Sequence, residues 1–283
     1  MTLSEAAPAK LNLALHVRAR GDDGYHSLES IFAFVDFSDR LQFQSAATLT
    51  LGIAGPFAAA IAVTEDDRDA PQPNLVLRAV AALAAASGNP ACGALTLWKA
   101  IPVAAGLGGG SADAAAALRL LARHWRLDWS LDRLAELAAT LGADVPACVY
   151  GTLQLGQGRG EQLSPLHRTG LGVTPVLLVN PGVALPTGPV FGGWDGIDRG
   201  ALDPNAPLAC LRNDLEASAI AIAPVIAAVL TVVSAQPGVT LVRMSGSGAT
   251  VFALFESESA RRAAAQAIGR DNPDWWLAET ALR

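Results

Sequence analysis

The chain has few cysteines, few lysines and little charge overall. Its 283 residues include three cysteines, Cys92, Cys148 and Cys210, which lie far apart and form no Cys-x-x-Cys pair. An odd, scattered set of this kind builds neither a disulfide framework nor a thiolate metal site, which predicts a reducing compartment. The net charge is −6, and this argues against a nucleic-acid-binding surface, because neutralising phosphates needs a surplus of Lys and Arg.

Segments that would target or span a membrane are also missing. Glu5 lies within the first ten residues and no apolar run follows a basic start, so we predict no signal peptide. The uncharged stretch from 217 to 235 approaches the roughly 20 residues that a membrane span requires. Pro224 and three hydroxyl side chains interrupt that stretch, so we interpret it as a buried helix, kinked or restarted at Pro224. We expect a cytoplasmic protein with no membrane partner.

Hydrophobic residues make up 51% of the chain, which is enough for a core and excludes disorder of its bulk. The length predicts one large domain or two ordinary ones. Between 151 and 189 the composition changes to Gly, Pro and Thr, which makes this segment a candidate domain boundary. Strands and helices mix without strict alternation, which favours an α+β fold in two lobes.

Local patterns predict individual elements. Apolar alternation and β-branched residues predict strands over 10–18, 30–35, 40–44, 94–98, 175–179, 240–244 and 250–255. Leu- and Ala-rich runs predict helices over 74–86, 111–124, 130–141, 213–234 and 258–268. Ser130 suits the N-cap of the third of these helices, and Gly142 suits its C-terminal end.

A glycine-rich loop, from Ile101 to Asp113, lies between a predicted strand and a predicted helix. Its glycines let backbone amides approach a ligand, and a helix N-terminus favours an anion such as phosphate. Ser111 could cap that helix or contact a phosphate or its metal ion. A Walker loop is excluded because no Lys-Ser/Thr follows the second glycine, and a dinucleotide-binding loop is disfavoured because position 111 is Ser. Taken alone, the loop fits a purely structural turn equally well.

Two other segments carry candidate chemical groups. Asp144, two residues before Pro146, suits the N-cap of a following helix, and on its own this structural interpretation is favoured. The functional alternative is a carboxylate that accepts or orients a hydroxyl proton. Lys10 is one of two lysines against 18 arginines, which suggests a site that needs a compact ammonium group, although an exposed lysine at a strand edge is the alternative. The other lysine, Lys99, has no assigned role.

Together these segments resemble the GHMP kinase superfamily of small-molecule kinases. Its glycine loop resembles residues 102–112, and its closing motif resembles residues 244–252. Within the superfamily, the segments 8–13, 23–30 and 142–146 resemble the branch that phosphorylates 4-diphosphocytidyl-2-C-methyl-D-erythritol in the non-mevalonate isoprenoid pathway. These motifs occur in the same order as in that branch.

The resemblance implies a two-lobed α+β fold with its active site in the cleft between the lobes. An N-terminal ATP-binding domain would span 1–155, and a C-terminal ferredoxin-like, substrate-side domain would span 156–283. ATP would donate its γ-phosphoryl group to the 2-hydroxyl of the substrate, cytidine-diphosphate methylerythritol. Asp144 would handle the hydroxyl proton, and Lys10 would steady the developing charge.

The resemblance also implies two sets of binding residues. Tyr25 and Phe191 would stack on the two faces of the cytosine, with His26 at its edge and Asn12 and Thr187 as further polar contacts. ATP would be bound by Pro102, Val103, Ala104, Ala105, Gly106, Leu107, Gly108, Gly109, Gly110, Ser111 and Ala112. Mg²⁺ is expected with ATP, held mainly by phosphates and water, because no protein ligand is identifiable.

The sequence departs from the pattern in the loop, where Ala104 and Ala105 replace a common Gly-Gly and Ala112 replaces a second Ser. Three alternatives remain. A homoserine or mevalonate kinase would keep the loop but would not need the Tyr25-His26 turn. A non-catalytic sensor would not need Lys10 or Asp144, and a dehydrogenase would need the missing glycine at position 111.

Overall fold

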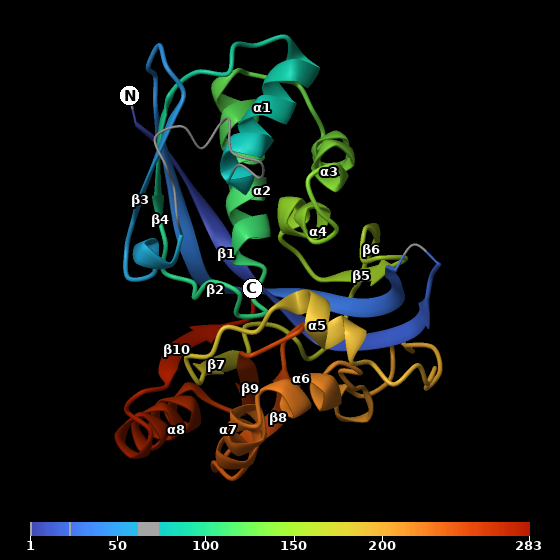
Figure 1. Ribbon diagram of the computed structural model, residues 1–283. Coiled ribbons are helices and arrows are strands. Elements are labelled where there is room, and N and C mark those ends of the chain that lie inside the picture. The colour runs from blue at the N-terminus through green and yellow to red at the C-terminus, as the bar shows by residue number, and fades with distance from the viewer. Residues whose placement is uncertain (1, 23, 62–73) are drawn as a thin grey trace. The chain divides into compact units, whose positions relative to one another are not determined.

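The computed structural model describes residues 2–22, 24–61 and 74–283 (Figure 1). They form two compact units that interleave along the chain. The first unit comprises the described residues of Met1–Ala9, Ser38–Val103 and Gly108–Gly151. The second comprises those of Lys10–Phe37, Ala104–Leu107 and Thr152–Arg283. The predicted domains, 1–155 and 156–283, stay a prediction.

Two long strands, β1 (Leu3–Arg20) and β2 (His26–Gln44), pair with each other and contribute to both units. The turn between them is closed by the Gly21 N–H, which donates to the Tyr25 carbonyl at 2.8 Å; Asp23 lies outside the described residues. The separate strands predicted over 30–35 and 40–44 are one strand. The polar residues between them remain extended because Asp39 is fully buried and accepts hydrogen bonds from the backbone of Ala100 and Ile101.

The first unit combines a short sheet with helices (Figure 1). β3 runs parallel to β4, and β4 pairs antiparallel with the end of β2, with Arg40 opposite Trp98. The helices α1 and α2 pack against each other, and the buried alanines of α2 permit close packing. The elements are β3 (Thr50–Ala54), η1 (Ala58–Ala60), α1 (Leu75–Ser87), β4 (Ala94–Trp98), α2 (Gly109–His124), α3 (Leu131–Ala139) and α4 (Val145–Tyr150).

Some helix ends agree with the local sequence signals and others do not. The Asn74 side chain caps α1 and Gly88 ends it in the left-handed conformation. The Ser130 side chain caps α3 as predicted, by accepting from the Arg133 N–H at 3.2 Å. α3 ends at Ala139 with Thr140 as C-cap, so the end predicted at Gly142 is wrong.

The second unit contains a four-stranded antiparallel sheet in the order β10-β7-β9-β8. With α6 and α7 after β7, and α8 after β9, this is the ferredoxin-like arrangement, and α7 and α8 pack on the sheet (Figure 1). In the same unit the start of β2 pairs with β5, and β5 with β6. The elements are β5 (Gln154–Gln157), β6 (Gln162–Pro165), β7 (Pro175–Asn180), α5 (Thr187–Gly192), η3 (Leu208–Cys210), α6 (Glu216–Ile222), α7 (Val225–Ser234), β8 (Val239–Met244), β9 (Val251–Phe255), α8 (Glu258–Asp271) and β10 (Trp276–Ala281).

The Ala-rich stretch is two helices, because α6 ends before Pro224 and α7 starts after it. Among the described residues no helix combines the length and the apolar character that crossing a membrane requires. The predicted α+β class and the ferredoxin-like sheet are confirmed.

Candidate active site

Lys10 is buried in the middle of β1, in the second unit. Its side chain is 3% exposed, and Nζ donates to Asn12 Oδ1 at 2.8 Å. Nζ also lies 4.9 Å from the centre of the Phe32 ring, a cation–π distance. The alternative of an exposed lysine at a strand edge is therefore wrong.

Asn12 is held in a fixed orientation by a chain of hydrogen bonds. Its Nδ2 donates to Ser30 Oγ at 2.8 Å, and Ser30 Oγ donates to the Ala14 carbonyl at 2.7 Å. With Nδ2 used in this way, Oδ1 faces the Lys10 ammonium group. The three side chains are buried, so this network specifies one position for the charge.

The first half of the glycine loop is also bound within the second unit. The Lys10 N–H donates to the Leu107 carbonyl at 2.9 Å, and Ser245 Oγ donates to the Gly106 carbonyl at 2.8 Å. The Thr250 N–H donates to the Ala105 carbonyl at 3.2 Å. The closing motif, 244–252, therefore contacts the loop directly, a relation that the order of motifs did not reveal.

The second half of the loop starts α2 in the first unit. Gly108 is the N-cap in the left-handed conformation, with φ at 62°. Ser111 is the third residue of the helix, so the prediction that Ser111 caps it is wrong. The helix instead starts where glycine permits a positive φ. The N–H groups of its first turn have no partners within the helix, as a phosphate site requires.

Below the start of α2 lies a buried ion cluster made of Lys99, Asp39 and Asp113, hereafter the Lys99 cluster. Lys99 Nζ contacts Asp39 Oδ2 and lies 2.7 Å from Asp113 Oδ2. All three side chains are almost completely buried. The scarcity of lysine in the sequence applies to Lys99 as much as to Lys10, but it led us to predict a functional role for Lys10 alone.

Asp144 lies in the first unit at the N-cap position of α4. Its backbone is helical (φ −84°, ψ −16°) and its side chain makes no capping hydrogen bond. Asp144 therefore occupies the predicted N-cap position of α4 without a capping hydrogen bond from its side chain. α4 is held at its other end, where Arg119 Nη1 donates to the Cys148 carbonyl at 2.6 Å and Nε pairs with Glu5 at 2.7 Å.

The residues expected to bind cytosine lie in the second unit. The His26 ring centre is 5.2 Å from that of Phe191 and 5.8 Å from that of Trp194. Burial, followed by the charge of Arg20, lowers the pKa of His26, which keeps its imidazole neutral at pH 7. Tyr25 is 59% exposed, and the Arg159 guanidinium lies 3.9 Å from its ring centre.

Thr187, the first residue of α5, has Oγ1 at 3.1 Å from Ser247 Oγ in the closing motif. Stacking of one base between Tyr25 and Phe191 stays a prediction. So do the roles of Lys10, Asp144, Asn12, Thr187 and residues 102–112.

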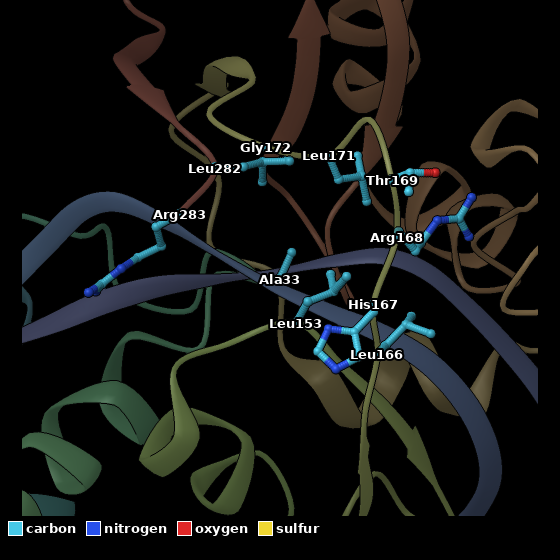
Figure 2. Close-up of a pocket in the computed structure, with 10 residues that line it drawn as sticks. All are labelled: Ala33, Leu153, Leu166, His167, Arg168, Thr169, Leu171, Gly172, Leu282 and Arg283. Atoms are coloured by element: carbon cyan, nitrogen blue, oxygen red, sulfur yellow. The ribbon is translucent and has the colours of Figure 1, made fainter.

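A cavity of about 350 Å³ in the second unit contains none of the predicted site residues (Figure 2). It is lined mainly by apolar side chains, with His167, Arg168 and Arg283 at its margins. The Arg168 guanidinium is occupied by the carbonyls of Pro204 and Ala206, each at 2.6 Å. We assign the cavity no part in the chemistry. Its lining is Ala33, Leu153, Leu166, His167, Arg168, Thr169, Leu171, Gly172, Leu282 and Arg283.

Comparison with known proteins identifies the family. The chain matches the family described as GHMP kinases N terminal domain over residues 74–152 and GHMP kinases C terminal over 195–274. A relative from Rhizorhabdus wittichii, named 4-diphosphocytidyl-2-C-methyl-D-erythritol kinase, is 53% identical over 99% of this chain and 94% of its own.

Solved structures agree with this assignment. A crystal structure of 4-(cytidine 5'-diphospho)-2C-methyl-D-erythritol kinase superposes with a TM-score of 0.78 at 33% identity, covering 99% of both chains. Homoserine kinase from Cytophaga hutchinsonii superposes with a TM-score of 0.70 at 18% identity over 99% of this chain and 94% of its own, which shows a shared fold alone. The resemblance read from the sequence is confirmed, and the chain belongs to the GHMP kinase family.

Proposed function

We propose that this chain transfers the γ-phosphoryl group of ATP to the 2-hydroxyl of 4-diphosphocytidyl-2-C-methyl-D-erythritol, in the cytoplasm. The observation that carries the proposal is the 53% identity, over nearly the whole of both chains, to a relative named for this activity. A homoserine or mevalonate kinase activity has weaker support, since the likeness to a homoserine kinase is 18% and to a mevalonate kinase 10%.

ATP would bind through the glycine loop, 102–112. Three backbone carbonyls of this loop, those of Ala105, Gly106 and Leu107, are taken up by protein donors. The N–H groups of the first turn of α2 have no partners within the helix and would bind phosphate oxygens. A preformed loop stabilises the charge of phosphoryl transfer without reorganising during the reaction.

Mg²⁺ would enter with the phosphates of ATP and neutralise part of their charge. Ser111 fits this ion, because a hydroxyl oxygen is a suitable ligand and the residue lies in the first turn of α2. The rest of the coordination would come from the phosphates and water.

In the chemical step the 2-hydroxyl oxygen bonds to the γ-phosphorus while the bond between that phosphorus and the oxygen of ADP breaks. The hydroxyl proton passes to the Asp144 carboxylate, at the N-terminal end of α4. The Lys10 ammonium group, oriented by Asn12, stabilises the negative charge on the reacting oxygens. Substitution of Lys10 and of Asp144 would test these two roles.

The cytosine would stack on the exposed Tyr25 ring and on Phe191. His26, neutral at pH 7, can donate or accept a hydrogen bond at the edge of the base. Thr187 and Asn12 would contribute polar contacts. The contact of His26 with Phe191 supports this arrangement, because it places two of the predicted residues side by side.

The direct test is a phosphoryl-transfer assay with ATP and Mg²⁺ against three acceptors: the cytidine-diphosphate methylerythritol substrate, homoserine and mevalonate. We expect turnover with the cytidine compound alone and a phosphomonoester product detectable by ³¹P NMR. An Asp144→Asn preparation made in parallel controls for contaminating kinases. Turnover with homoserine or mevalonate instead would reject the proposed substrate, and ATP binding without turnover of any acceptor would favour a sensor.

A further inference from the structure

The Lys99 cluster joins the two ends of the glycine loop. At the entering end, Asp39 Oδ1 accepts the N–H groups of Ala100 at 2.6 Å and Ile101 at 2.8 Å. At the leaving end, Asp113 belongs to the second turn of α2. Lys99 Nζ bridges the two carboxylates, so the backbone before the loop and the helix after it are held to one buried ammonium group.

The loop also contacts the ammonium group directly. A Cβ added to Gly109, the first residue of α2, would lie 2.9 Å from Lys99 Nζ and 3.3 Å from Ile101 Cγ2. A methyl group at this position would require Lys99 Nζ to shift from its place between the two carboxylates. The start of α2 therefore lies directly against the cluster.

The two carboxylates of the cluster have different hydrogen-bond partners. Asp39 accepts two backbone N–H groups besides its contact with the ammonium group. In the described part of the chain, Asp113 Oδ1 is buried and has no hydrogen-bond partner. Burial, opposed by Lys99 and reinforced by Asp39, raises the pKa of Asp113 to about 7. The two carboxylates raise the pKa of Lys99 by more than burial lowers it, so Lys99 is cationic.

We propose that Lys99, Asp39 and Asp113 are positioning residues for ATP, which set the separation between the two ends of the glycine loop and thereby the placement of its phosphate-binding N–H groups. This inference rests on the proposed ATP-binding role of the loop. The three residues need not touch the nucleotide. Their effect is on preorganisation, and a misplacement of about 1 Å in such groups can cost on the order of 100-fold in rate.

The test uses the full chain and three substitutions, Lys99→Met, Asp39→Asn and Asp113→Asn. Affinities for ATP, ADP and AMP are measured by calorimetry in the absence of acceptor, and affinity for the cytidine substrate is measured separately. We expect Lys99→Met to weaken ATP binding by about tenfold or more. The loss should shrink from ATP to AMP, because fewer phosphates meet the loop, while cytidine-substrate affinity stays within about twofold.

A matched control comes from another partly buried cation. Arg261 donates to Glu279 at 3.2 Å and to the Thr280 carbonyl at 2.7 Å, outside the loop and its neighbours. Arg261→Met removes an ion pair elsewhere in the chain, with a more exposed carboxylate partner, and should leave ATP and cytidine-substrate affinity unchanged. Thermal melting of each variant shows whether it folds. If Lys99→Met fails to fold, the isosteric Asp113→Asn carries the test, with a smaller but equally phosphate-dependent loss.

Two results would overturn the inference. One is a folded Lys99→Met or Asp113→Asn variant with wild-type affinity for ATP. The other is an equal loss for ATP, AMP and the cytidine substrate, which indicates a general structural role. Failure of the proposed function is distinguishable, because it appears in the unsubstituted protein as absence of ATP binding or of phosphoryl transfer.

Discussion

The Ser245 hydroxyl donates to the Gly106 carbonyl oxygen at 2.8 Å, and so joins the closing motif to the glycine loop. The two residues are in close contact, which leaves no space for a side chain on Gly106. A Cβ on Gly106 would lie 2.3 Å from the Ser245 carbonyl oxygen, and Gly106 has a φ of +75°. Contact with the closing motif therefore explains why position 106 is glycine.

We predict that Gly106→Ala weakens ATP binding by about tenfold or more, because the methyl group must displace backbone of the closing motif. Gly170→Ala is a control, since Gly170 has a similar φ of +82° but nothing within 4 Å of its Cβ position. Gly170→Ala should lose roughly 1 kcal/mol of unfolding free energy from backbone strain and keep its ATP affinity. Equal ATP affinities for the two variants would count against the fitted contact.

Asp144→Asn should lose about 10²–10⁴-fold in kcat while the variant remains folded. Thermal melting of the variant checks that it folds. Ser130→Ala is the reciprocal control, because Ser130 does cap α3. That variant should lose about 1 kcal/mol of unfolding free energy and retain its kcat. An Asp144→Asn variant that keeps near-normal turnover would remove Asp144 from the chemistry.

Lys10→Arg and Lys10→Ala should both lower kcat by roughly 100-fold. A guanidinium group is larger than an ammonium group and cannot occupy the buried site, 2.8 Å from Asn12 Oδ1, without displacing the network. Arg270→Lys, at an exposed ion pair with Asp271, should have no effect on kcat. From the sequence, Lys99→Arg would be a mild exchange. The burial of Lys99 between two carboxylates instead predicts a substantial loss of kcat, so Lys99→Arg cannot serve as the control.

Local signals predicted much of the fold. The capping side chains of Asn74 and Ser130 mark helix starts, and the strand 94–98 agrees with β4 at both ends. β10 was missed because its sequence, Trp276–Ala281, is not clearly alternating, and it is stabilised as a strand by pairing with β7, about 100 residues earlier. Such a partner cannot be identified from a local pattern.

The candidate site likewise contains residues that sequence motifs predicted and residues that they did not. Motifs in the sequence predicted candidate residues such as Lys10 and Asp144, whose chemical roles stay predictions. The Lys99 cluster joins residues 60 and 14 positions apart, and no local pattern distinguishes Asp39 from a surface aspartate. Burial distinguishes Asp39 from a surface aspartate, and burial is seen only in the folded structure.

The unfolding free energy should depend on pH through Asp113. Burial raises its pKa from 3.8, the ordinary value of an aspartate, to about 7 in the folded protein, so the folded state keeps a proton that the unfolded state releases. Stability from this group is full below pH 4 and is lost as the pH rises towards 7, with a slope of roughly 1 kcal/mol per pH unit at most. Asp113→Asn should lack that slope in denaturant titrations between pH 5 and pH 8.

Asp271→Asn provides the comparison for this pH dependence. Asp271 is exposed, and the hydrogen bond from Arg270 lowers the pKa of its carboxyl group, so its titration lies below the window from pH 5 to pH 8. Its curve should run parallel to that of the unsubstituted protein over this range. If the Asp113→Asn curve also runs parallel, Asp113 does not hold the proton.

Recognition of the cytidine substrate should depend on the Tyr25 and Phe191 rings. Tyr25→Ala and Phe191→Ala should each weaken its binding by about tenfold or more, because stacking of a base on an aromatic ring contributes roughly 1–3 kcal/mol. ATP affinity should change little, since the phosphates would meet the glycine loop.

Tyr25→Phe keeps the stacking face and should be mild. Tyr25→Ala removes an exposed ring and its contact with Arg159, whereas Phe191→Ala loses a contact with His26, so thermal melting checks that each variant folds. Calorimetric titration with the cytidine substrate and with an ATP analogue decides the matter. A Tyr25→Ala variant that lost ATP affinity and kept the cytidine ligand would show that the two pockets are reversed.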